Sequence, residues 1–376
     1  MDFQATSPLL MVSVEEETWF VSLNGEKTVP KLKNSQKDMC IGSSHGWLIL
    51  LDESSEPYLL NPFNQSRIQL PKKFTFPHIN RVTSECWRGG ECIWVSYTSG
   101  FTRRFGPTEY KWPVLSIKKA ILSANPSTHE DFVVAVIYGN ESRIAYCRNG
   151  DDEWREIQDG DSYAYFDIAC PDGDLLYALG KNGTVEVWDL TASSIPLKKK
   201  DRTTQPSCPK RFIDAMIINY PGRLYARKFY LVPCAKSGQI FLVVRYVGKF
   251  VTSDGIVVSH PSMVWPYKTI DFHVYRLDTT TSAWKTVKSL DNLALFLGGN
   301  HSVSMLVSDH SDLKADAIYF TDNYWARMYG HYLYGAHDMG VFSLEDETIH
   351  QFLNIDLQKI KPPSFWLVPE SSKLVT

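Results

Sequence analysis

The 376-residue chain is 44% hydrophobic and 22% charged, which is ordinary for a folded protein and argues against a disordered, collagen-like or coiled-coil chain. Its 39 basic and 42 acidic side chains give a net charge of −3, so a general nucleic-acid binder is not expected. An aromatic content of 13%, with 22 Gly and 20 Pro, favours many short strands joined by tight turns.

Neither end of the sequence nor its cysteines point to secretion. Residues 1–8 lack the basic and apolar regions of a signal peptide, and no run reaches the ~18 apolar residues of a membrane span. The seven cysteines are scattered and include no Cys-x-x-Cys pair, which favours reduced thiols over a disulfide framework or a zinc site. We therefore expect a cytoplasmic or nuclear protein that binds neither membrane nor nucleic acid.

Strand-like runs recur along most of the chain. The clearest are 47–51, 120–122, 132–138, 143–147, 184–190, 239–245, 272–277, 317–320 and 340–344. Turn dipeptides separate them: Asn24-Gly25, Asn149-Gly150, Asp172-Gly173, Asn182-Gly183, Pro221-Gly222 and Ser237-Gly238. Helical patterns are few; residues 291–297 are the best case for one or two helical turns. Many short strands predict a sandwich, a barrel or a propeller.

A weak internal repeat favours the propeller. A polar turn ending in tryptophan occurs at residues 151–154 and again at 281–284, each after a strand-like run, as expected for consecutive hairpins of propeller blades. At ~40–50 residues per blade, the chain accommodates about seven four-stranded blades, with six or eight as alternatives. The Trp188-Asp189 pair occurs only once and does not indicate WD repeats. We expect one all-β propeller domain over residues 1–376, with its core at roughly 8–370.

Several motifs, in order along the chain, are more specific than this periodicity. They are 40–48 (CIGSSHGWL), 59–63 (LLNPF), 67–71 (RIQLP), 119–126 (KAILSANP), 146–148 (YCR), 177–179 (YAL), 230–232 (YLV), 296–298 (FLG), 318–322 (IYFTD), 338–342 (DMGVF) and 362–369 (PPSFWLVP). Together they resemble the plant F-box-associated KIB-type β-propeller family over roughly residues 8–370. The resemblance implies a protein-recognition propeller similar to the substrate-binding half of F-box ubiquitin-ligase receptors, with a client that can be a kinase.

The resemblance does not extend to an F-box. Many family members carry this helical segment before the propeller, where it docks an adaptor of a cullin ubiquitin ligase. Residues 1–40 contain no such helices, because 9–12 and 18–23 have the pattern of strands near the Asn24-Gly25 turn. Binding to the cullin-ligase adaptor is therefore not implied.

The family motifs contain eight residues to which we assign structural roles. Glycines permit turns or close packing, Asn-Pro favours a turn, and the aspartate is expected to accept hydrogen bonds from backbone amides rather than to catalyse. These residues are Gly42, Gly46, Trp47, Asn61, Pro62, Pro71, Asp338 and Gly340.

No pattern of a catalytic or cofactor site appears. The phosphate-binding glycine motifs and the Gly-x-Ser-x-Gly nucleophile motif are absent. His331, His337 and Asp338 fit no familiar metal spacing, and Asp172-Gly173-Asp174 lacks the remaining ligands of a calcium loop. We expect a non-enzymatic protein without catalytic residues, cofactor or metal.

Two aromatic and cationic segments are the candidate partner contacts. Trp, Tyr and Arg concentrate binding energy at protein interfaces, and the loops of a propeller gather on its two faces. The candidates are Arg103, Arg104, Phe105, Tyr110 and Trp112 in one segment and Tyr324, Trp325, Arg327, Tyr329 and Tyr332 in the other. Three functions stay open: recognition of a client protein, an enzyme or sugar-binding propeller with a site in its central channel, and an inactive truncated paralogue.

Overall fold

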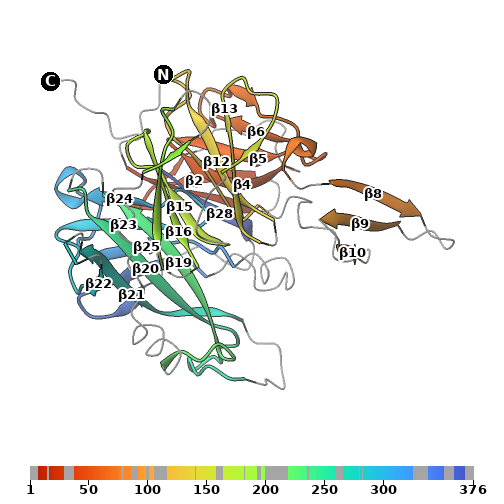
Figure 1. Ribbon diagram of the computed structural model, residues 1–376. Helices are drawn as coiled ribbons and strands as arrows, with labels where there is room; N and C mark the ends of the chain where they lie inside the picture. Colours follow the sequence, from red (N-terminus) through yellow and green to blue (C-terminus); the bar gives the residue numbers. More distant parts are fainter. Residues whose placement is uncertain are drawn as a thin grey trace.

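The computed structural model consists of small sheets whose strands mostly follow one another along the chain (Figure 1). This is the arrangement that short apolar runs and tight turns predict. The structure describes residues 7–14, 17–28, 38–77, 80–86, 92–98, 101–105, 117–139, 141–157, 164–181, 183–192, 196–199, 219–234, 237–259, 266–278, 280–281, 283–324, 338–350 and 360–368.

Six sheets of the described residues form the blades of a propeller. Their innermost strands lie side by side around the axis in the order β28, β4, β11, β15, β19 and β24. From the axis outwards, blade 1 is β28 (Ile360–Leu367), β1 (Leu9–Val14), β2 (Glu17–Val21) and β3 (Lys27–Thr28). Blade 2 is β4 (Met39–Ser44), β5 (Trp47–Leu51), β6 (Pro57–Leu60) and β7 (Arg67–Gln69). Blade 3 is β11 (Lys119–Leu122), β12 (Val133–Tyr138), β13 (Arg143–Arg148) and β14 (Arg155–Glu156).

The remaining three blades continue in chain order. Blade 4 is β15 (Tyr165–Ala169), β16 (Leu175–Gly180), β17 (Val185–Asp189) and β18 (Leu197–Lys198). Blade 5 is β19 (Tyr225–Pro233), β20 (Ile240–Gly248), β21 (Lys268–Asp278) and β22 (Ala283–Thr286). Blade 6 is β24 (Val303–Leu306), β23 (Leu293–Leu297), β25 (Ala317–Phe320), β26 (Gly340–Ser343) and β27 (Thr348–His350). The described residues also include two single turns of 3-10 helix, η1 (Lys73–Thr75) and η3 (Val307–Asp309).

A seventh sheet lies outside the ring. It consists of β8 (Asn80–Cys86), β9 (Cys92–Thr98) and β10 (Phe101–Phe105), and it projects away from the blades in Figure 1. The flanking blades 2 and 3 touch directly, because β4 packs beside β11. The prediction of an all-β propeller is thus confirmed. The blade number is six, the lower alternative, rather than seven, because residues 80–105 form a sheet that is not a blade.

Both ends of the chain contribute to blade 1. β28 pairs antiparallel with β1, placing Trp366 opposite Leu10. Phe365, Trp366 and Leu367 are at most 1% exposed, and the Trp366 ring meets Phe296 of blade 6 edge-on at 5.2 Å between centroids. The last strand therefore closes the ring between blades 6 and 2.

Apolar side chains fill the spaces between neighbouring blades. One buried cluster joins blades 2 and 3, and others join blades 3 and 4, 4 and 5, and 5 and 6. The two repeated tryptophans belong to these contacts. Trp154 of blade 3 donates its indole N–H to the Pro71 carbonyl of blade 2, and Trp284 of blade 5 donates to the Gly183 carbonyl of blade 4.

Blade 6 contains the expected helical segment, and that expectation is wrong. Leu293–Leu297 is the buried strand β23, which pairs antiparallel with β24 and parallel with β25. Asp291 and Asn292 have φ of +54° and +67°, so the chain turns sharply there before entering the strand.

The two faces of the ring can be told apart by strand direction. We call the face at which the innermost strands β4, β11, β15, β19 and β28 begin the N-face, and the opposite one the C-face. Ser44 and Leu122, at the ends of β4 and β11, are hydrogen-bonded at 3.3 Å on the C-face side. The described residues just before β11, 117–118, lie on the N-face, and so does Asp338 before β26, which is bonded to Thr269 at the start of β21.

Candidate partner-binding site on the N-face

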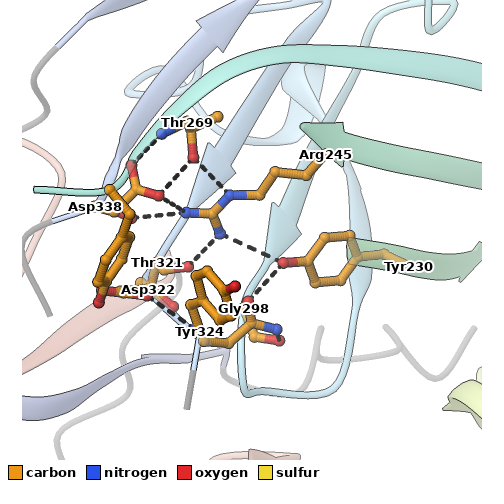
Figure 2. Close-up of polar contacts among 10 residues, drawn as sticks. Tyr230, Arg245, Thr269, Gly298, Thr321, Asp322, Tyr324 and Asp338 are labelled. Carbon is orange, nitrogen blue, oxygen red and sulfur yellow. Dashed lines mark hydrogen bonds and ion pairs between the residues drawn. The ribbon is translucent and has the colours of Figure 1, made fainter. Parts of the chain in front are cut away.

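The connection from β25 to β26, residues 321–339, starts and ends among buried polar groups between blades 5 and 6. Arg245 of β20 lies among these groups and is 1% exposed. Figure 2 shows its polar contacts. The guanidinium is 2.8 Å from Asp338 Oδ2 and also donates to the backbone carbonyls of Asp338 and Thr321, at 2.9 and 2.7 Å. Arg245 thus binds residues at both ends of the connection.

Further groups around Arg245 complete its hydrogen bonding (Figure 2). Its Nε donates to Thr269 Oγ1 at 2.7 Å, and this hydroxyl in turn donates to Asp338 Oδ2. The other carboxylate oxygen of Asp338 accepts the backbone N–H of Thr269 at 2.8 Å. The guanidinium also lies 4.6 Å from the ring centroid of Phe320. Charge-assisted bonds of this kind hold a buried ion pair in one geometry.

The start of the connection has a second acidic anchor, Asp322, which is 1% exposed. Tyr267 donates its hydroxyl to Asp322 Oδ2 at 2.5 Å, and the backbone N–H of Tyr324 donates to Oδ1 at 2.9 Å. Burial and the neighbouring Asp338 raise the pKa of Asp322, while Arg245 opposes this shift. Burial and the Asp322 charge raise the pKa of Tyr267, so this hydroxyl keeps its proton as the donor.

Lys228 of β19 in blade 5 lies close to Asp322 and Tyr324. Its Nζ lies 4.8 Å from the ring centroid of Tyr324, within the range of a cation–π contact. The residue is partly exposed, and desolvation by the surrounding protein lowers its pKa to about 8. The positive charge of Arg245 acts in the same direction, and Asp322 opposes it.

The axis of the ring is filled by polar contacts between blades. Lys119 of β11 lies 2.9 Å from Asp167 of β15, and Asp167 also accepts the backbone N–H of Leu231 of β19 at 2.8 Å. Burial raises the pKa of Asp167, and the Lys119 charge opposes this shift. Ser302 of blade 6 lies within 3.4 Å of both charged groups.

Nearer the C-face, His301 bridges three blades. Its ring Nδ1 is 3.2 Å from Ser44 Oγ, and its ring Nε2 accepts the backbone N–H of Cys170 at 3.1 Å. The backbone N–H of His301 donates to the Ser43 carbonyl at 2.9 Å. Burial lowers the pKa of His301 well below its usual range, so the ring is neutral at physiological pH, with its proton on Nδ1.

Of the expected partner contacts, the structure describes the side chain of Tyr324 alone. Arg103, Arg104 and Phe105 belong to strand β10, whose backbone is described. The others, Tyr110, Trp112, Trp325, Arg327, Tyr329 and Tyr332, lie outside the described residues.

The family-motif glycines occupy positions with little room or unusual backbone angles. A Cβ on Gly42 would lie 2.5 Å from the Ala120 carbonyl oxygen, and one on Gly340 would lie 2.6 Å from the His350 carbonyl oxygen. Gly46, with φ of +76°, follows His45 in the tight turn between β4 and β5.

The other family-motif residues make local or inter-blade hydrogen bonds. Trp47 donates its indole N–H to Asn125 Oδ1 at 3.0 Å. Asn61 Oδ1 accepts the N–H of Phe63, and the carbonyls of Pro62 and Pro71 accept side-chain N–H groups of Gln65 and Trp154. Asp338 was expected to bond nearby amides; its amide partner, Thr269, is distant in sequence and joins Arg245 in a buried network.

Sequence reasoning missed Arg245, Lys228 and Asp322. One signal was available for Arg245, the one charged residue between Ile240 and Gly248 in a run that is otherwise apolar or aromatic. A charge inside such a strand requires a buried partner. No pattern in the sequence identifies that partner.

Metal and membrane features are also absent from the described part. No three His, Cys, Asp or Glu side chains there gather closely enough to hold a metal ion. Nor does any helix in it have the length and apolarity that crossing a bilayer requires.

Comparison with known proteins decides the family. A model described as the KIB1-4 beta-propeller matches residues 20–343. The chain belongs to the KIB1-4 β-propeller family. The F-box/kelch-repeat protein KIB1 of Arabidopsis thaliana is 22% identical over 288 residues, which are 77% of this chain and 56% of that protein. The F-box protein KIB4 of the same plant is 23% identical over 297 residues, 78% of this chain and 63% of that protein.

The KIB1-4 propeller is thus related to part of larger F-box proteins, since the match spans less than two thirds of either relative. Similarity to solved structures is low. Apo AztD from Citrobacter koseri gives a TM-score of 0.32 at 10% identity, covering 96% of this chain and 99% of that one. The N-terminal domain of Nup159 gives 0.28 at 11% identity, covering 65% and 71%. These scores are too low to inform function.

Proposed function

We propose that this KIB1-4 propeller recognises a client protein through its N-face and performs no chemistry. The observation that carries the proposal is the anchoring of residues 321–339. Arg245 holds both ends of this connection, and Tyr267 holds Asp322 near its start. A connection rich in Trp, Tyr and Arg, fixed at both ends by buried groups, is suited to presenting side chains to a partner.

The contents of the axis support recognition over catalysis in a central channel. In the part of the chain that the structure describes, the charged groups there are Lys119 and Asp167, and they bind each other and the backbone of a third blade. The imidazole of His301 is likewise engaged at both nitrogens. Catalytic acids and bases must instead face a substrate.

Membership of the KIB1-4 family supports a protein as the ligand, because the matched relatives are F-box proteins by name. We propose client recognition alone; recruitment of a cullin adaptor belongs to the F-box. A kinase is one client that the family suggests, and the cytoplasm or nucleus is the expected compartment. Co-purification of the chain with the cullin adaptor would contradict the restriction to client binding.

Replacing Trp325 and Arg327 together by alanine tests the proposal. We expect loss of most client capture in pull-downs and proximity labelling from plant cells, since two strong interface residues disappear, while the melting temperature stays unchanged. The matched control is the pair Phe74→Ala and Arg223→Ala, both exposed residues elsewhere on the surface. Equal capture by the wild-type chain and the Trp325→Ala/Arg327→Ala variant, at equal melting temperature, would reject this site.

A further inference from the structure

An exposed pair of aromatic rings lies at the N-face side of blades 4 and 5. Phe166 of β15 is 40% exposed, and its ring stacks on Phe229 of β19 with centroids 4.5 Å apart and planes 10° apart. Phe166 sits at a bulge, where the register of β15 against β16 shifts between Tyr165 and Asp167. Bulges of this kind re-aim a side chain. This one leaves a phenylalanine in solvent although its neighbours are buried.

Stacking on a second ring distinguishes Phe166 from the other large apolar side chains that are exposed in the described residues. Those are Phe74, Leu197 and Ile256, and none of them stacks on a second aromatic ring there. Phe229 is itself partly buried and packs against the apolar cluster between blades 4 and 5. The pair therefore forms a fixed apolar surface on the N-face between blades 4 and 5, and an exposed apolar surface can mark an interaction site.

Positive charge borders this surface. Lys228 precedes Phe229 in β19, so its side chain points to the opposite side of the strand, toward Tyr324 of blade 6. The charged groups that act on Lys228 are Arg245 and Lys118, which repel it, and Asp322, which attracts it. Asp322 already accepts hydrogen bonds from Tyr267 and from the backbone of Tyr324.

Lys118 stands just before β11 of blade 3, on the same face, and is exposed. Its ammonium group donates to the hydroxyl of Ser142. Five residues thus lie on the N-face around the axis of the ring, from blade 3 to blade 6. We call them the mouth arc: Lys118, Phe166, Lys228, Phe229 and Tyr324. Among the charged groups that shift the pKa of Lys228, two are cations, Arg245 and Lys118, and one is a carboxylate, Asp322.

We propose that the mouth arc binds an acidic peptide segment of the client, with a carboxylate beside Lys228 and an adjacent aromatic or aliphatic side chain on the Phe166–Phe229 stack. The proposal rests on client recognition by the N-face and adds the chemistry of the bound segment. A carboxylate gains from the excess of positive charge, and an apolar neighbour covers the exposed ring. A basic segment would be repelled at the same place.

Selection from a displayed library of random peptides on the folded full chain tests this chemistry. We expect enriched peptides to carry Asp or Glu next to an aromatic or aliphatic residue. Their affinity should fall about tenfold for Lys228→Gln and again for Phe166→Ser. The matched controls are Lys72→Gln and Phe74→Ser, which are exposed in blade 2 and should leave affinity unchanged. Enrichment of basic peptides, or of none, would overturn the proposal.

The pH dependence supplies a second readout. The pKa of Lys228 is about 8, so the ammonium loses its proton as pH rises through that value. Affinity for an enriched acidic peptide should therefore fall between about pH 7 and about pH 9.5 in the wild-type chain and fall less in Lys228→Gln, where Lys118, whose pKa burial also lowers, remains. A similar fall in both chains would assign the effect to another group and contradict the role of Lys228.

Client capture separates this proposal from the broader one. If Lys228→Gln/Phe166→Ser captures clients as well as the wild-type chain does while Trp325→Ala/Arg327→Ala does not, client recognition stands and the mouth arc is refuted. If all these variants capture clients normally, both proposals fail.

Discussion

Arg245 shows how one side chain can hold both ends of the connection from β25 to β26. It lies inside a strand that is otherwise apolar or aromatic, and its ion pair joins residues 93 positions apart. Burial opposes the charge of Arg245, but the Asp338, Tyr230 and Asp322 side chains together outweigh it and raise the pKa of the guanidinium. Removing either partner would leave an uncompensated charge in the interior, which is far more costly than losing a surface pair.

Replacing Arg245 by methionine is expected to lower the free energy of unfolding by about 3–5 kcal/mol, because Asp338 stays buried without its cation. Urea unfolding measures this loss. The matched control is Arg276→Met, since Arg276 pairs with Asp291 at 3.1 Å on the surface and its loss should cost less than about 1 kcal/mol. Adding Asp338→Leu to Arg245→Met should restore part of the stability. Equal small losses for the two arginine variants would show that the buried pair is not a major anchor.

At the scale of elements, the close approach of innermost strands depends on small residues. Gly42 of β4 faces the Ala120 carbonyl of β11, and no other residue type fits that distance without movement. The same two strands also make polar contacts near the axis of the ring. Ser44, two residues after Gly42, contacts His301, and Lys119, directly before Ala120, pairs with Asp167. A shift of β4 against β11 would therefore disturb the axial hydrogen bonds.

The variant Gly42→Ala should destabilise the protein by about 1–3 kcal/mol, because the new Cβ forces blades 2 and 3 apart. Gly222→Ala is the matched control: no atom lies within 4 Å of the added carbon, and its effect should stay within about 0.5 kcal/mol. Thermal or urea unfolding of both variants measures the difference. A Gly42→Ala chain as stable as Gly222→Ala would mean that the blades yield at this contact without cost.

Local pattern was enough to predict most strands, and contacts between distant residues account for the errors. The runs 47–51 and 317–320 coincide with β5 and β25, because apolar β-formers bounded by turn residues specify a strand locally. Residues 291–297 were expected to be helical but form a turn and strand β23. The positive φ angles of Asp291 and Asn292 make that turn, and the sequence pattern does not reveal them. The prediction of a seventh blade was wrong because it divided the chain length by a typical blade length. Residues 80–105 add to that length, but their sheet lies outside the ring, where β4 packs directly beside β11.

The candidate site was predictable only in part, for a similar reason. Aromatic and cationic composition marks residues 323–334, but the groups that anchor the connection come from β20, β21 and the segment before β21. The mouth arc was not foreseen at all. Phe166 lies between residues that are buried, and its exposure results from a bulge that nothing in the sequence indicates.

At the scale of the whole molecule, the ring is held from its centre as well as between its blades. His301 of blade 6 bonds Ser44 of blade 2 and Cys170, which follows β15 of blade 4. These contacts require the neutral imidazole, because Nε2 must accept a hydrogen bond. Protonation would therefore weaken a link that spans the axis.

Acid should destabilise the chain through His301. Its folded-state pKa lies well below 6.5, so the unfolded chain binds more protons below that pH and stability falls as pH falls, by at most about 1.4 kcal/mol per pH unit. Urea unfolding at about pH 7.5 and about pH 5.5 should show a smaller drop for His301→Gln than for the wild-type chain. The exposed control His129→Gln should keep the wild-type slope. Identical slopes in all three proteins would exclude His301 as the acid-sensitive group.

Blade 1 has a consequence for how the protein is made in the cell. Its innermost strand comes from residues 360–367, and its other three strands come from residues 9–28. During synthesis, blades 2 to 6 leave the ribosome in order while β1 waits with an unpaired edge, which is a surface that attracts other chains. The ring, and with it the face that we assign to the client, is complete only after Leu367 has emerged. We therefore expect that a nascent chain without β28 does not yet offer the proposed client face, and chaperones have reason to cover β1 until translation has passed this point.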